Sequence, residues 1–335
     1  ILLNKKFNVF KNYFFIFFLI FYLTILISSL QSANIFFSLH SSLPYIRFGL
    51  FILCVWHTAK EDIKLFNKIF LVLTAIYILL VFDGYLQFFT GTNILNFEKT
   101  GIRISSFFGD ELVLGSYVIR FLPIYLGLYF YTIVKRYISI YEKIFFLIFF
   151  ILISILVIIS GERTAFALLL ISIFLILFSL KGFKKARISF LLIFVLTSII
   201  FTFVYQNNFQ RLFVETKQQI IKENKIYFFG QRRHEYANVS INIFKDNIFL
   251  GSGPRTYRVE SKNDKYAISD LSWNTHPHSM YLQLLAETGI MGTLLIIFVF
   301  CYFIIQIFNQ SKNKNFSNLK FNIQSCVVIA IIINF

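Results

Sequence analysis

Two histidines separated by a proline stand where a long polar stretch meets an apolar run. His276 and His278 flank Pro277, which disfavours helix at the residue before it and is well suited to a helix start. The apolar residues 294–300 that follow place His278 near a boundary between water and lipid. A neutral imidazole can act there as a general base near pH 7. His278 is therefore the candidate base and His276 a secondary candidate, and a purely interfacial polar pair is the alternative.

A zinc site at these histidines would need further ligands. No Cys or acidic cluster stands nearby at the usual zinc spacing. The three cysteines all lie in apolar runs, at Cys54, Cys301 and Cys326. We therefore expect no metal, no cofactor and no disulfide framework.

Two arginines open a segment that has the pattern of an amphipathic helix. Arg232 and Arg233 precede apolar residues at helical spacing, and Gly251 ends the segment. An arginine in the first turn opposes the helix dipole unless an anion is near, and the free amides of that turn can bind an anion. The pattern predicts a phosphate or diphosphate clamp centred on Arg233. A solvated basic turn balanced by Glu235 is the alternative.

Another arginine lies in a very short turn between two apolar runs. Arg163 follows Gly161-Glu162, so its guanidinium must stay close to the helix ends. An ionised side chain at that depth is costly and tends to mark a partner or a site. The alternative is an interfacial arginine that reaches water or pairs with Glu162. The polar stretch 83–111 adds Arg103 as a secondary candidate, with other side chains that could line an outward cavity: Asp83, Gln87, Asp110 and Glu111. A charged loop that is simply solvated is the alternative.

Composition indicates the fold that must position these residues. Hydrophobic residues make up 57% of the 335 residues, and charged residues only 14%. Apolar runs of about 18 residues or more predict membrane-spanning helices, because backbone groups in lipid must be satisfied within the helix. The net charge of +16 does not indicate nucleic acid, since most basic residues do not gather on a soluble face. The chain starts without Met and stops inside an apolar run, so we expect a fragment that is truncated at its C-terminal end.

The predicted protein is all-α and polytopic, with about nine spans and one large extracytoplasmic helical loop. We expect complete spans at 13–30, 43–58, 65–82, 112–131, 144–160, 165–180 and 188–205, an eighth ending near 308, and a ninth that is cut off. The expected regions are N-terminal spans in 1–82, an extracytoplasmic segment in 83–111, central spans in 112–205, a large periplasmic loop in 206–278 and C-terminal spans in 279–335.

The distribution of basic residues predicts which side of the membrane each loop faces. Alternate short loops carry basic clusters, around Lys5, Lys64, Lys135, Lys184 and Lys314. Cytoplasmic loops are enriched in Lys and Arg, so these clusters face the cytoplasm. The four segments that carry Arg103, Arg163, Arg233 and His278 then share the outer face. We therefore expect a multi-pass membrane protein whose candidate residues face outward, which is the periplasm if the cell has two membranes; the resemblance described next implies the bacterial inner membrane.

Four segments together resemble the O-antigen ligase and O-antigen polymerase superfamily. The resemblance rests on residues 276–292, on Arg233 followed by the Gly251-Ser252-Gly253 turn, on the Arg163-Thr164 turn, and on Arg103 with residues 107–115. They occur in the family's order and cover about 83–292. The sequence departs from the family at Ile248, where proline is common, and loosely at Tyr257.

The resemblance implies a membrane glycosyltransferase of the GT-C type that works without a metal. Such proteins transfer a glycan from undecaprenyl diphosphate to an acceptor on the outer face, which is lipid A-core, another glycan or a protein. It implies that His278 deprotonates the acceptor hydroxyl, and that Arg163 and Arg233 bind the donor diphosphate. Sequence does not separate a ligase from a polymerase. The alternative from another class is a transporter or flippase for an anionic solute or lipid-linked glycan, using Arg47, Arg120 and Arg163, although no internal repeat supports it.

Overall fold

A computed structural model describes residues 10, 13–62, 64–135, 139–182, 187–188, 191–192, 194–195, 210, 214–222, 225–226, 230–269, 272–311 and 317–334. The chain divides into two compact units. The first holds residues 1–63 and 218–305, and the second holds residues 64–217 and 306–335. Most of the predicted span at 188–205 lies outside the described residues.

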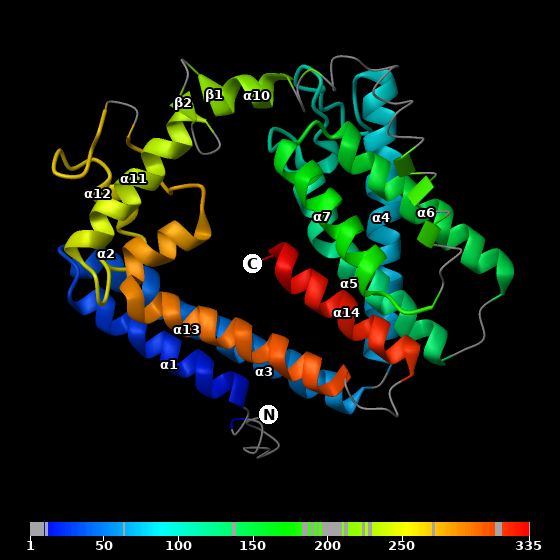
Figure 1. The fold of residues 1–335 in the computed structure, drawn as a ribbon, viewed down its shortest axis with the longest axis horizontal. Coiled ribbons are helices and arrows are strands. Elements are labelled where there is room, and N and C mark those ends of the chain that lie inside the picture. The colour runs from blue at the N-terminus through cyan, green and yellow to red at the C-terminus, as the bar shows by residue number, and fades with distance from the viewer. Residues whose placement is uncertain are drawn as a thin grey trace. The chain divides into compact units, whose positions relative to one another are not determined.

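The first unit is built from apolar helices and a smaller polar part. Its elements are α1 (Tyr13–Leu30), α2 (Ile35–Ser42), a 3-10 turn (Leu43–Tyr45), α3 (Ile46–Glu61), the short strands β1 (Ile221–Lys222) and β2 (Lys225–Ile226), α11 (Gln231–Asp246), α12 (Tyr257–Glu260) and most of α13 (Met280–Ser311). The helices α1, α3 and α13 run side by side (Figure 1), and Phe14 and Phe17 of α1 meet the rings of Phe303 and Phe298 of α13. Aromatic contacts therefore hold the membrane part of this unit together.

Buried serines join α1 to α2 in the first unit. Ser29 and Ser42 share a hydrogen bond of 2.6 Å between their hydroxyls, and both are fully buried. Each hydroxyl also lies within hydrogen-bonding distance of a carbonyl one turn back along its own helix, and the two hydroxyl protons can serve two of these three contacts at a time. Small side chains of this kind allow close helix approach and leave no polar group unsatisfied.

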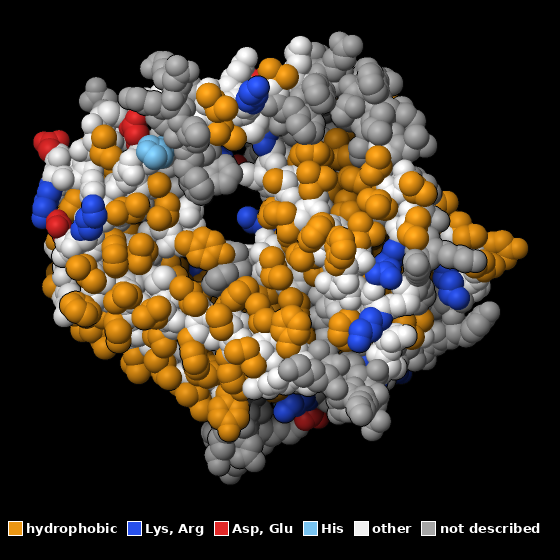
Figure 2. Space-filling view, in the orientation of Figure 1, with side chains coloured by type: hydrophobic (Ala, Val, Ile, Leu, Met, Phe, Trp, Pro, Cys, Tyr) orange, Lys and Arg blue, Asp and Glu red, His pale blue; other side chains and the backbone are white. Residues whose placement is uncertain are grey.

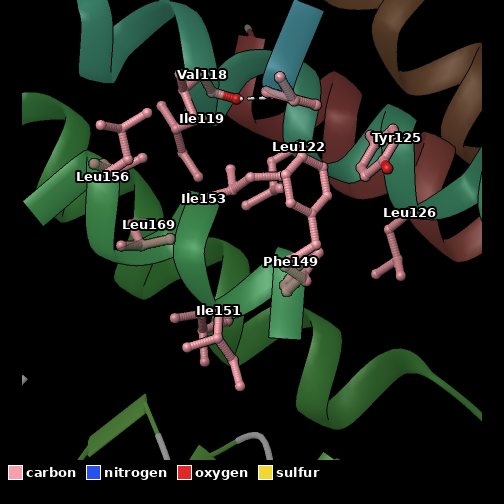
Figure 3. Packing of buried hydrophobic residues seen from close by; sticks show 14 of the residues in the cluster. Val118, Ile119, Leu122, Tyr125, Leu126, Phe149, Ile151, Ile153, Leu156 and Leu169 are labelled. Atoms are coloured by element: carbon pink, nitrogen blue, oxygen red, sulfur yellow. Dashed lines mark hydrogen bonds between the residues drawn. The ribbon is translucent and has the colours of Figure 1, made fainter. Parts of the chain in front are cut away.

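The second unit is a helical bundle with most of the hydrophobic core. Its elements are α4 (Leu65–Thr90), a 3-10 turn (Ser106–Phe108), α5 (Leu114–Lys135), α6 (Ile140–Ile159), α7 (Arg163–Ser179), α14 (Asn318–Asn334) and the first half of α10 (Glu215–Ile220). Figure 3 shows Val118 and Leu122 of α5 facing Ile153 and Leu156 of α6, and Tyr77 donates to the Val118 carbonyl at 3.0 Å. The core is thus formed between helices and not beneath a sheet.

The predicted outward segment 83–111 is organised by two buried polar side chains. Asp83 accepts hydrogen bonds from Asn93, from the Ile94 amide and from Ser106. Gln87 donates to the Phe97 carbonyl at 3.0 Å and accepts from the amides of Ser105 and Ser106. Both side chains are 0% exposed. Asp83 and Gln87 therefore neither line an outward cavity nor belong to a solvated loop, because they satisfy the polar groups of an irregular segment.

Five described helices are long and apolar enough to cross a membrane. They are 13–30, 35–61, 65–90, 140–159 and 280–309. Hydrophobic side chains cover much of the visible surface over these helices in Figure 2, and charged side chains are sparse there. The protein is therefore an all-helical membrane protein apart from two strands of two residues each in the described part of the chain. The second predicted span was too short, since the helical segment runs from Ile35 to Glu61.

Candidate functional site

His278 lies in the loop that leads into α13, outside the apolar part of that helix. Its backbone is left-handed, with φ of 55°, which is unusual for a residue with a side chain. Its ring centroid is 4.3 Å from that of His276 and 5.8 Å from that of Tyr236 on α11. Burial, His276 and the charge of Arg233 together lower the pKa of His278 below its usual range. The imidazole is therefore neutral at pH 7, as a general base must be.

Arg233 lies in the first turn of α11, as the sequence predicts. The buried face of this helix includes Tyr236, Val239 and Ile243, which confirms the predicted amphipathic pattern. The helix ends at Asp246 and not at Gly251, because residues 247–250 form a turn. Arg233 is exposed, and its charge acts on His278. The structure therefore brings the candidate base and one candidate phosphate ligand together within the first unit.

A break in α13 explains why the glycine turn belongs to this site. Gly289 has φ of 62° and ψ of −162°, which interrupts the helix. The amides of Ile290 and Met291 after the break donate to the carbonyls of Ile248 and Phe249. The carbonyls of Ala286 and Glu287 before it accept from the amides of Ser252 and Gly253. The turn after α11 thus supplies the hydrogen bonds that the broken helix lacks.

The two backbones meet too closely for side chains. A Cβ at Gly251 would lie 2.3 Å from the carbonyl carbon of Glu287, and one at Gly289 would lie 2.5 Å from that of Phe249. The Glu287 carboxylate is buried and accepts from the Tyr257 amide at 3.2 Å. This contact, which sequence reasoning missed, fixes α11, α12 and the start of α13 as one support for Arg233 and His278.

Arg163 is the first residue of α7 in the second unit. Its Nη2 lies 2.6 Å from the Oε2 of Glu215 on α10, and the two side chains are 22% and 48% exposed. Glu162, which would pair with Arg163 if that arginine were only interfacial, makes other contacts. It is 6% exposed and accepts from the amides of Gly115 and Ser116 at the start of α5. Arg163 therefore pairs with a carboxylate from the long loop and not with its neighbour.

Arg103 lies beside the same turn in the second unit. Its Nη2 donates to the Leu112 carbonyl at 2.7 Å. A Cβ at Gly161 would lie 3.2 Å from the Cγ of Arg103, and Gly161 has φ of 68°. The turn that carries Arg163 therefore needs glycine where Arg103 crosses it.

The candidates thus form two groups, one in each unit. The first unit brings together His276, His278 and Arg233, with Arg232 exposed on the same helical turn as Arg233. The second unit brings Arg103 close to the turn of Arg163. Convergence of the two groups on one substrate stays a prediction. In the described part of the chain, no group of three or more His, Cys, Asp or Glu side chains is placed to hold a metal ion.

No curated protein matches the chain. Residues 148–297 match a family described as O-antigen ligase. The matched range contains Arg163, Arg233, the Gly251–Gly253 turn, His278 and the break at Gly289, whereas Arg103 lies before it. This match confirms, over residues 148–297, the resemblance to the O-antigen ligase and polymerase superfamily.

Proposed function

We propose that the protein transfers a glycan from undecaprenyl diphosphate to an acceptor hydroxyl at the periplasmic face of the inner membrane. The acceptor is lipid A-core sugar for a ligase or a second repeat unit for a polymerase. The proposal is carried by His278 and Arg233, which lie in the same unit and interact electrostatically, within the region that matches the O-antigen ligase family.

In the proposed reaction, His278 removes the proton of the acceptor hydroxyl as its oxygen attacks the anomeric carbon of the donor. The new C–O bond forms while the bond from that carbon to the diphosphate oxygen breaks, and undecaprenyl diphosphate leaves. Arg233 and Arg163 bind the diphosphate and stabilise the charge that develops on it. Guanidinium suits this role because its planar fork pairs with two phosphate oxygens.

The ion pair between Arg163 and Glu215 supports the proposed role of Arg163 in binding the diphosphate. A carboxylate of Glu215 lies 2.6 Å from its guanidinium, so the side chain already stands where an anion can reach it. Arg232, Arg103 and His276 are proposed to have secondary roles, in attracting the anionic donor or in holding the loops around it.

The proposal is tested by glycan transfer in membranes that contain His278→Ala, Arg163→Ala or Arg233→Ala. We expect His278→Ala to lower transfer by about 10²–10⁴-fold, and each arginine variant by about 10²–10³-fold. Arg47→Ala is the matched control, since Arg47 is exposed on α3 and lies over the Phe48 ring. Full transfer by both His278→Ala and Arg163→Ala, at normal protein levels, would contradict the assigned roles.

A further inference from the structure

A hydrogen bond to His278 identifies a residue that neither the sequence patterns nor the family match single out. Asn274 Nδ2 lies 2.9 Å from His278 Nε2, four residues along the same loop. The Asn274 carbonyl accepts from Ser261, and the neighbouring Trp273 donates its indole N–H to the Arg258 carbonyl. The backbone of Asn274 is therefore held to the C-terminal end of α12 by its own carbonyl, and to α12 itself by the preceding residue, Trp273.

The orientation of the Asn274 amide follows from its second contact. The Thr275 amide donates to Asn274 Oδ1 at 2.7 Å, and only an oxygen can accept there. The amide nitrogen must then face His278. An amide NH₂ group donates and does not accept, so His278 Nε2 accepts the bond and carries no proton. The proton of the neutral ring is then on Nδ1.

We propose that Asn274 is a positioning residue for the base: it holds His278 in the tautomer whose unprotonated Nε2 receives the acceptor proton. This inference rests on the proposed function of His278. The acceptor hydroxyl takes the place of Asn274 Nδ2 as the donor to Nε2, and the proton then moves to that nitrogen. Because the Thr275 amide holds Asn274 Oδ1 away from His278, Asn274 offers no hydrogen-bond acceptor to a protonated Nε2. Before the acceptor binds, this contact therefore favours the neutral ring of His278.

The other groups around the ring do not select a nitrogen in this way. His276 faces the ring at 4.3 Å between centroids, and Tyr236 of α11 faces it at 5.8 Å. Arg233, also on α11, acts on it through its charge. His276 Nδ1 has its own contact, at 2.9 Å from the Thr275 hydroxyl. The 2.9 Å bond to Asn274 is the contact that reaches Nε2.

The test replaces Asn274 by Asp in the full chain, purified in lipid nanodiscs. A carboxylate accepts a proton from Nε2 and favours the charged ring, so the pKa of His278 should rise. Transfer needs the unprotonated base, so the acid limb of the pH profile of kcat/KM should move to higher pH by roughly 1 pH unit or more. The KM of the glycan donor should stay near its wild-type value. Asn274→Ala should give a smaller shift in the same direction, because it removes a donor that opposes protonation.

A second readout does not depend on activity. ¹⁵N NMR of histidine-labelled protein distinguishes protonated from unprotonated ring nitrogens, and His278→Gln assigns the signals among the five histidines. We expect an unprotonated Nε2 in the wild type and a protonated Nε2 in Asn274→Asp. Asn263→Asp is the matched control, because Asn263 accepts from the Lys265 amide in an exposed turn and an Asp keeps that bond.

Two results would overturn the proposal: an unchanged acid limb in Asn274→Asp, or the same His278 nitrogen signals in Asn274→Asp and wild type. Failure of the proposed function would look different. In that case the wild type would transfer no glycan, while the NMR signals would still report which nitrogen Asn274 holds.

Discussion

At the scale of single residues, the central feature is an imidazole with a lowered pKa. Partial desolvation of His278, the second histidine beside it and the charge of Arg233 each disfavour the protonated form of His278. A base with a lowered pKa keeps its lone pair in mildly acidic surroundings. The sequence could place His278 near a helix start, but its left-handed backbone and its bond to Asn274 depend on the loop 272–278, which has no periodic pattern.

The contribution of His276 can be measured by its replacement with Gln. Replacement of the second imidazole by a neutral amide removes an electrostatic effect that lowers the pKa of His278. The pKa of His278 should therefore rise, and the acid limb of transfer should move to higher pH, while the rate at high pH changes little. Profiles of kcat/KM against pH for the two proteins check this. A limb that moves to lower pH would contradict the electrostatic explanation.

At the scale of elements, the glycine turn after α11 and the break in α13 are one feature. Sequence reasoning treated Gly251-Ser252-Gly253 as a turn that ends a helix, and it assigned no role to Gly289. A helix pattern shows where a helix continues, but it does not show which distant backbone supplies the missing hydrogen bonds at a break. The predicted face of α11 was confirmed because apolar spacing determines it locally.

Gly289→Ala should destabilise the protein and Gly101→Ala should do so much less. Both glycines have positive φ, of 62° and 63°, so an alanine meets a backbone penalty at each. Only Gly289 also has backbone atoms within 2.6 Å of an added Cβ, whereas Gly101 has nothing within 4 Å. We expect Gly289→Ala to cost about 1–3 kcal/mol more. Thermal unfolding of both variants in detergent checks this, and equal loss would contradict the docking.

The ion pair between α7 and α10 leads to a prediction about donor binding. If the diphosphate takes the place of Glu215 on Arg163, the carboxylate competes with the donor. Glu215→Gln should therefore lower the KM for the lipid-linked donor and leave kcat near the wild-type value. Asp246→Asn is the control, since Asp246 pairs with Lys265 at 2.5 Å in an exposed position. A higher KM in Glu215→Gln would mean that Glu215 supports the site.

At the scale of the whole molecule, the sequence established an all-helical membrane protein because long apolar runs leave few other folds. Five helices qualify as spans in the described residues. Two further apolar helices, 163–179 and 318–334, are shorter than these five. Helix α5 has a charged residue, Arg120, within its length. The number of nine spans and the side that each loop faces stay predictions, since they depend on the membrane and on residues outside the described ranges.

Cysteine labelling tests the predicted orientation. Cys54 and Cys301 are exposed on helices and would first be replaced by Ser. An Asn263→Cys variant should then react with a membrane-impermeant maleimide in intact spheroplasts. A Lys64→Cys variant should react only after the membrane is opened, because basic loops face the cytoplasm. The reverse pattern would put His278 on the cytoplasmic side and would contradict the proposed reaction.

The backbone docking at Gly289 also limits how this protein can diverge. Four backbone hydrogen bonds join residues 248–253 to residues 286–291. The two backbones can approach this closely because Gly251 and Gly289 carry no side chain. None of these contacts depends on side-chain chemistry. A larger residue at one glycine has no compensating change at the other, because the obstacle is main chain. Natural relatives that keep this architecture should therefore retain both glycines, while the side chains around them can vary.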